Sequence, residues 1–147
     1  MKLSQFFTFI YIPREVETEA SRKKRRRRKL AKLFRSGVFR KCVVSDSTGI
    51  ESLTRDKRLD RGEAEALVQT QEQRALFFIG DEPLAREIAA NMGRRVIGTA
   101  AILARLNLIG LAGDPRLLIN ELRKAENFYI TEEVLGQAIE SASTPLL

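Results

Sequence analysis

The fold is decided by residues 75–108, which read ALFFIGDEPLAREIAANMGRRVIGTAAILARLNL. An apolar run of strand length over 75–79 leads into a helical pattern over 82–92 that stops at Gly93. A short strand is expected over 95–97, and a strongly apolar helix follows over 99–108. Strands that alternate with helices in this way predict an α/β protein with a mainly parallel sheet.

The flanking sequence extends the same alternation. Toward the N-terminus we expect a helix opened by Asp60, a second strand near 38–45, an interrupted helix over 14–35 and a strand over 5–12; residues 46–59 are ambiguous. Toward the C-terminus we expect a helix over 115–126 behind Asp114-Pro115 and a last helix capped by Thr131. One domain over 1–147 is predicted, with a basic insertion at about 21–41.

Composition narrows the function. The apolar fraction of 44% suffices for a core, and no apolar run approaches the length of a membrane span, so no membrane partner is expected. Cys42 is the single cysteine, which fits a reducing compartment and predicts a cytoplasmic protein. The chain has no histidine, so catalysis would have to use carboxylates, Lys and Arg, hydroxyls or a metal ion held by oxygen ligands.

Positive charge is concentrated in one segment. The net charge is +7, yet residues 14–41 contain 13 basic and three acidic side chains, so the rest of the chain is mildly acidic. An unbroken basic run predicts binding to a polyanion, with nucleic acid favoured; its members are Arg22, Lys23, Lys24, Arg25, Arg26, Arg27, Arg28 and Lys29. A solvated helix without a ligand and a nuclear-import signal are the alternatives.

Three carboxylates lie at junctions between predicted elements. Asp81 follows the buried strand, Glu63 lies in the first turn of the preceding helix, and Glu19 lies on the helix after the first strand. Because binding crevices lie beyond the carboxyl ends of parallel strands, these side chains could converge with Glu82 on one site. Oxygen ligands of this type suit Mg²⁺ or Mn²⁺, which can polarise a phosphodiester.

Each carboxylate also has a structural interpretation. Asp60 and Glu63 are spaced as a capping box, and Asp81 before Pro83 could be an ordinary N-cap. Glu19 could pair with a basic residue of its own helix. Glu65 lies about 200° around the helix from Glu63, so the two cannot easily face one site.

The order and spacing of several stretches resemble the PIN-domain nucleases, in particular the VapC-like branch of bacteria and archaea. The resemblance runs from about residue 9 to 140 and rests on IPREVETE (12–19), LDRGEAEAL (59–67), LFFIGDE (76–82) and VIGT (96–99). It implies a three-layer α/β/α fold and a metal-dependent endoribonuclease of the toxin–antitoxin type. Its partners would be RNA and an antitoxin protein.

By residue match, the resemblance implies Glu19, Glu63 and Asp81 as catalytic residues and ligands of Mg²⁺ or Mn²⁺. Glu82 and Thr99 would be accessory residues. Family members begin with a strand ending in aspartate, and this strand and its ligand are expected to be missing here. Asp46 could replace that ligand only in a rearranged topology.

Three functions therefore remain open. The first is a Mg²⁺-dependent ribonuclease whose basic segment binds RNA. The second is a catalytically inactive PIN-like module that binds nucleic acid or a protein through residues 22–41. The third is a structural protein that forms a homodimer through its apolar helix over 99–108 and an exposed sheet edge.

Overall fold

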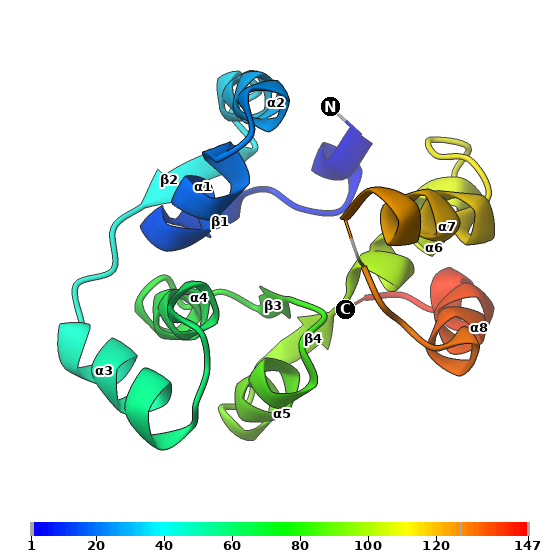
Figure 1. Ribbon diagram of the computed structural model, residues 1–147. Helices are drawn as coiled ribbons and strands as arrows, with labels where there is room; N and C mark the ends of the chain where they lie inside the picture. Colours follow the sequence, from blue (N-terminus) through cyan, green and yellow to red (C-terminus); the bar gives the residue numbers. More distant parts are fainter. Residues whose placement is uncertain (1, 127, 147) are drawn as a thin grey trace. The chain divides into compact units, whose positions relative to one another are not determined.

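The computed structural model describes residues 2–126 and 128–146 and divides the chain into two compact units, residues 3–96 and the part from Ile97 onward (Figure 1). The first stretch of chain forms η1 (Lys2–Gln5), β1 (Ile10–Pro13), α1 (Arg14–Ser21), α2 (Lys24–Arg35), β2 (Phe39–Cys42), α3 (Ser47–Asp56), α4 (Arg61–Glu72), β3 (Phe77–Ile79), α5 (Pro83–Asn91) and β4 (Arg95–Ile97). The mixed α/β class predicted from the sequence is confirmed.

The described strands form two separate pairs, β1 with β2 and β3 with β4. β1 and β2 are parallel, with Ile10 opposite Phe39 and Pro13 opposite Cys42. Within the described residues no strand joins the two pairs. This arrangement agrees with the expectation that an inner strand of the sheet is missing.

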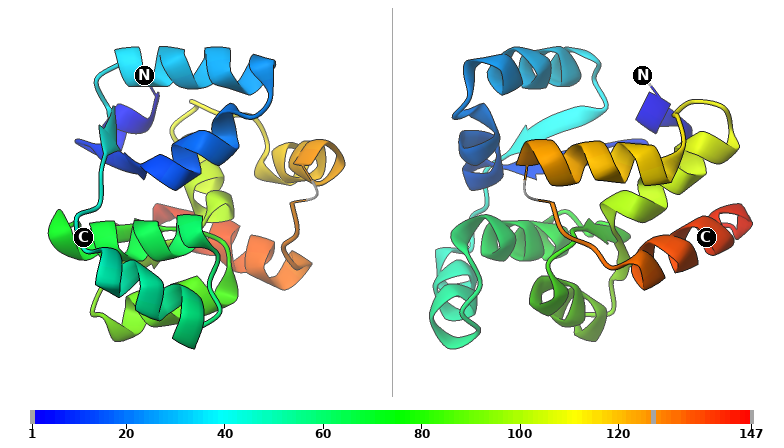
Figure 2. Two further views of the ribbon diagram at one scale, coloured as in Figure 1. Left: turned by 60° about the vertical axis from the view of Figure 1, so that its left-hand side comes forward. Right: turned by 45° about the vertical axis from the view of Figure 1, so that its right-hand side comes forward.

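Helix α4 is the centre of the first unit. It packs against α1, α3 and α5 and against the strands β1 and β3, and Figure 2 shows α3 and α4 lying side by side. Its apolar face supplies Ala64, Leu67 and Val68 to a core that also contains Phe78 of β3. Because Leu67 is fully buried, this helix is held firmly and can position side chains at its N-terminus.

Helix boundaries follow local chemistry. The predicted interrupted helix over 14–35 is two helices, and the break falls at Arg22 and Lys23, inside the basic run. The ambiguous stretch 46–59 contains α3, which begins where the Asp46 carboxylate accepts the Gly49 N–H at 2.8 Å. The predicted first strand is shorter than expected, because a 3-10 turn replaces its beginning.

The second unit is helical and has its own core. It contains α6 (Thr99–Leu108), α7 (Pro115–Glu126), α8 (Glu132–Glu140) and the short η2 (Ser141–Ser143). Ile119 and Leu135 are almost completely buried in this core. The buried Arg105 guanidinium donates to the carbonyls of Ser141 and Thr144, both at 3.3 Å, and so ties the end of the chain to α6.

None of the helices in the described part of the chain has the length and apolar composition needed to cross a bilayer.

Candidate active site

The three predicted acidic residues line one pocket of the first unit. Glu19 reaches it from α1, Glu63 from the first turn of α4, and Asp81 from the segment between β3 and α5. Glu82, the predicted accessory residue, lines the same pocket, whose volume is about 240 Å³. The expectation that these distant parts of the chain converge therefore agrees with the structure, while their catalytic role stays a prediction.

The start of α4 forms one wall of the pocket. Asp60 caps this helix by accepting the Glu63 N–H at 2.8 Å, and the Glu63 carboxylate accepts the Asp60 N–H at 3.4 Å. The capping box that the spacing suggested is therefore present. A Cβ on Gly62 would lie 3.5 Å from Glu19 Oε2 and 3.4 Å from the Val16 side chain, so α1 lies close against α4 here.

The segment after β3 forms the opposite wall. A Cβ on Gly80 would lie 2.6 Å from the Phe78 ring, so only glycine fits at this turn. The Arg86 guanidinium of α5 donates to the Gly80 carbonyl at 2.9 Å and holds the turn immediately before Asp81. The N-cap of α5 is Glu82, whose carboxylate accepts the Ala85 N–H at 2.6 Å, so the interpretation of Asp81 as that cap is wrong.

The charges in the pocket act on one another. Partial burial is the main cause of a raised pKa at Glu63, and the negative charge of Asp60 raises it further. The hydrogen bond from the Asp60 backbone opposes this shift, whereas Glu82 and Glu19 add to it. Carboxylates on three segments of chain therefore repel one another electrostatically across the pocket.

The donor set fits a hard divalent cation in its chemistry, since carboxylate oxygens are preferred ligands of Mg²⁺ and Mn²⁺ and a cation would relieve the repulsion at Glu63. The geometry is not preformed. Among residues 2–126 and 128–146, no three acidic or thiol side chains lie close enough together to hold a metal ion as they stand. Joint coordination by Glu19, Glu63 and Asp81 would require at least one of these side chains to rotate.

Two other carboxylates of the first unit have structural partners. The Glu65 side chain is buried, as expected for a residue on the other side of α4 from Glu63, and it contacts Glu15 and Arg61. Asp46 caps α3 and does not line the pocket. Asp46 therefore does not replace the missing aspartate of the first family strand.

Thr99, the other predicted accessory residue, is the first residue of α6 and belongs to the second unit. Its contribution to the pocket stays a prediction.

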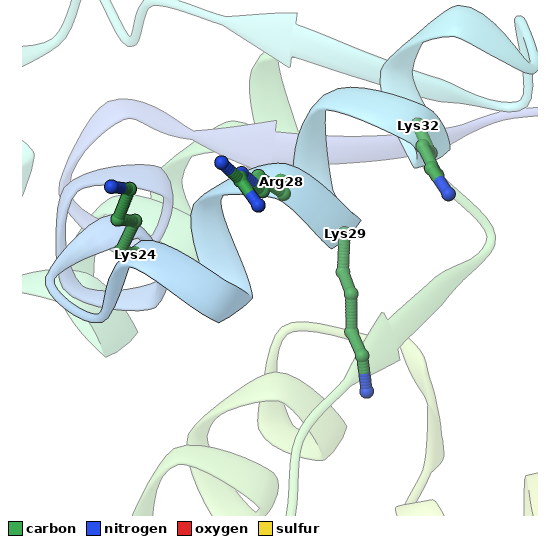
Figure 3. A pocket seen from close by; sticks show the side chains of 4 residues that line it. All are labelled: Lys24, Arg28, Lys29 and Lys32. Carbon is green, nitrogen blue, oxygen red and sulfur yellow. The ribbon is translucent and has the colours of Figure 1, made fainter.

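The basic run has a defined cationic face. Lys24, Arg28, Lys29 and Lys32 all extend from α2 and line an open hollow of about 510 Å³ (Figure 3). Three of them are spaced four residues apart and therefore form one row along the helix. Leu30, Leu33 and Phe34 are half-buried on other positions of α2. The side chain of Arg25 lies outside the described part of the structure.

Sequence reasoning missed some residues of both regions. Lys32 lies outside the predicted run at 22–29, although its spacing from Lys24 and Arg28 could have revealed it. The apolar lining of the pocket, including Val16 and Phe78, has no sequence signal distinguishable from ordinary core packing. Arg86 was part of a resembling stretch, but its hydrogen bond to the turn before Asp81 became visible only in the structure.

Comparison with known families gives one match. A family model described as a PIN domain matches residues 1–144, and so covers nearly the whole chain and parts of both units. No curated protein and no solved structure matches the sequence.

Proposed function

This chain belongs to the PIN-domain family, and on that premise we propose that it is a metal-dependent endoribonuclease of the toxin–antitoxin type. The observation that supports the proposal best is the convergence of Glu19, Glu63 and Asp81 on one pocket from separate parts of the chain. Their mutual repulsion, seen in the raised pKa of Glu63, is what a site built for a cation shows before the cation binds.

In this proposal the three carboxylates would hold one or two ions of Mg²⁺ or Mn²⁺. When bound, such an ion polarises the scissile phosphate and lowers the pKa of an attacking water. Glu82 is engaged as the cap of α5 and would add negative charge at the rim. Val16, Phe78 and Ile79 give the pocket an apolar wall that limits the access of bulk water.

The cationic face of α2 would bind the RNA backbone. Lys24, Arg28 and Lys32 form a row of positive charges along one helix, which suits successive phosphates better than a single small anion. An antitoxin protein that covers these charges is the partner that the family resemblance implies, and a cytoplasmic location fits such a role. Homodimer formation remains an additional proposal.

The experiment is a cleavage assay on a mixed RNA substrate with Mg²⁺ or Mn²⁺, comparing the wild type with Asp81→Asn. Asp56→Asn is the matched control, because Asp56 is an exposed residue at the end of α3 outside the pocket. We expect Asp81→Asn to lower the rate by at least about 100-fold, in line with the loss of a group that stabilises transition-state charge. Equal cleavage by all three proteins would refute the carboxylate assignment.

A second candidate is a catalytically inactive PIN-like module that binds RNA through α2. The lack of a preformed three-carboxylate cluster among the described residues favours it. This candidate predicts RNA binding by the wild type without cleavage in either metal, and RNA affinity that is the same in Asp81→Asn.

A further inference from the structure

The buried carboxylate of Glu65 is the feature of the first unit that the proposed chemistry does not use. Glu65 is only 7% exposed, which is unusual for a charged residue without a specific role. Its Oε2 accepts the backbone N–H of Glu15 at 2.9 Å, fifty residues away in the sequence. Its Oε1 accepts from Arg61 Nε, one turn earlier on α4, at 3.2 Å.

The hydrogen bond to Glu15 supplies a cap that α1 lacks in its own sequence. Helix α1 follows Pro13, which occupies the N-cap position and has no side chain that could accept a hydrogen bond. The first N–H groups of a helix have no partner within the helix and carry partial positive charge. A carboxylate delivered from α4 satisfies one of them and is attracted by the helix dipole.

The capped end of α1 lies one turn before Glu19. Glu15 and Glu19 are four residues apart and so share one face of α1, about 6 Å apart along its axis. At that second turn, Glu19 and Val16 approach α4 at Gly62, which is three residues before Glu65 and therefore on the same side of α4. Helix α1 is thus held on α4 at two successive turns, and the second turn carries a lining residue of the pocket.

We propose that Glu65 is a positioning residue that caps α1 from α4 and thereby sets the location of the Glu19 carboxylate in the pocket. The effect on metal binding rests on the proposed function, whereas the effect on α1 does not. Releasing the cap would let the first turn of α1 fray and would move the turn that carries Val16 and Glu19 away from Gly62. Glu65 itself would touch neither the metal ion nor the RNA.

The first test uses NMR and needs no metal. In the wild type we expect slow exchange of the Glu15 amide and a nuclear Overhauser effect between the Val16 methyl groups and the Gly62 Hα protons. Glu65→Ala should lose both signals, while Glu65→Gln, which keeps an oxygen acceptor, should retain them. Slow Glu15 exchange together with an unchanged Val16–Gly62 contact in Glu65→Ala would overturn the proposal.

If Glu65→Ala does not fold, Glu65→Asp takes its place. The aspartate keeps the negative charge but is shorter by one methylene group, so its oxygens fall short of the Glu15 N–H. The same two signals should weaken in Glu65→Asp relative to Glu65→Gln. Full retention of both signals in the aspartate variant would contradict the capping role.

The second test is a double-mutant cycle on Mn²⁺ affinity, measured by calorimetry. Changes in residues that orient metal ligands typically weaken affinity about 10- to 100-fold, and we expect about tenfold for Glu65→Ala in the wild-type background. In a Glu19→Gln background the same change should have little further effect, because Glu65 acts through Glu19. Equal losses in both backgrounds would show that Glu65 does not work through Glu19.

The two tests separate this proposal from the function on which it depends. If the wild type binds no Mn²⁺, the proposed metal-dependent activity fails, and the NMR experiment still decides whether Glu65 positions α1 and Glu19.

Discussion

At the scale of single residues, Glu63 combines two roles that are usually kept apart. Its carboxylate completes the capping box of α4 and also faces the other acidic side chains of the pocket. Burial and the charges of Asp60, Glu82 and Glu19 raise its pKa, so its ionised form is disfavoured in the folded protein. A cap alone does not require this proximity to other carboxylates, and the raised pKa therefore makes Glu63 a candidate functional residue.

The raised pKa predicts a pH-dependent gain of stability in Glu63→Gln. The folded protein binds the Glu63 proton more tightly than the unfolded chain does, so this residue costs stability as the pH rises through its raised pKa. Glutamine keeps an oxygen for the Asp60 N–H and carries no charge. We expect Glu63→Gln to be more stable than the wild type at pH 7, by less than about 1 kcal/mol because the group is partly solvated.

The measurement is urea unfolding at pH 7 and at a pH below the usual range of glutamate. At the lower pH the difference between the two proteins should shrink, because Glu63 is then protonated in both the folded and the unfolded wild type. Glu87→Gln on the exposed side of α5 serves as the control and should show no such pH dependence. A destabilised Glu63→Gln at pH 7 would mean that capping outweighs repulsion.

At the scale of elements, α2 presents more charge than its neighbours can neutralise. The face formed by Lys24, Arg28, Lys29 and Lys32 lines an open hollow, and all four side chains are exposed. If this face contacts RNA phosphates, neutralising it must release fewer counterions on binding.

We therefore predict that changing these four residues to glutamine weakens RNA binding and flattens its salt dependence by up to about three slope units, at about 0.7 per lost phosphate contact on a single strand. The matched control changes Arg22, Lys23, Arg26 and Arg27, which removes the same charge from the same segment without touching the hollow. Fluorescence anisotropy between 50 and 300 mM salt gives both slopes. If the two variants lose the same slope, the basic segment acts through net charge alone and the face has no special role.

The same scale shows how far the sequence alone predicts this structure. The helices α5, α6, α7 and α8 lie close to their expected bounds, because Pro83, Asp114 and Thr131 are strong local start signals. The break between α1 and α2 and the helix α3 were not predicted. Their ends depend on contacts with distant residues, such as the Glu72 carboxylate that accepts the Ser45 and Asp46 N–H groups.

The candidate site was predictable only in part for the same reason. The positions of Glu19, Glu63 and Asp81 at element junctions were sufficient to predict their convergence, because parallel strands direct their carboxyl ends to one edge. The capping of α1 by Glu65 depends on a hydrogen bond between residues 15 and 65, which no local pattern encodes. Nor does sequence spacing show whether the carboxylates lie within joint reach of one ion.

At the scale of the whole molecule, the candidate pocket belongs entirely to the first of the two compact units. A ligand that binds only the folded protein stabilises it by RT ln(1 + [L]/Kd), which is about 1.4 kcal/mol at ten times the dissociation constant. For a chain of this size that corresponds to a rise in Tm of about 3–5 °C. We predict such a rise with Mn²⁺, and none in Asp81→Asn under the same conditions.

Hydrogen exchange locates this stabilisation within the chain. In the presence of Mn²⁺, amide exchange should slow in the segments that form the pocket, at about residues 14–20, 60–66 and 78–85. The helices α6, α7 and α8 have a separate core and contribute no residue to the pocket, so their exchange should change much less. Potassium chloride at matched ionic strength is the control for screening of the basic segment. Protection by Mn²⁺ that appeared mainly over residues 99–140, or not at all, would place the cation elsewhere or remove it, and the carboxylates of the pocket would then have only their structural roles.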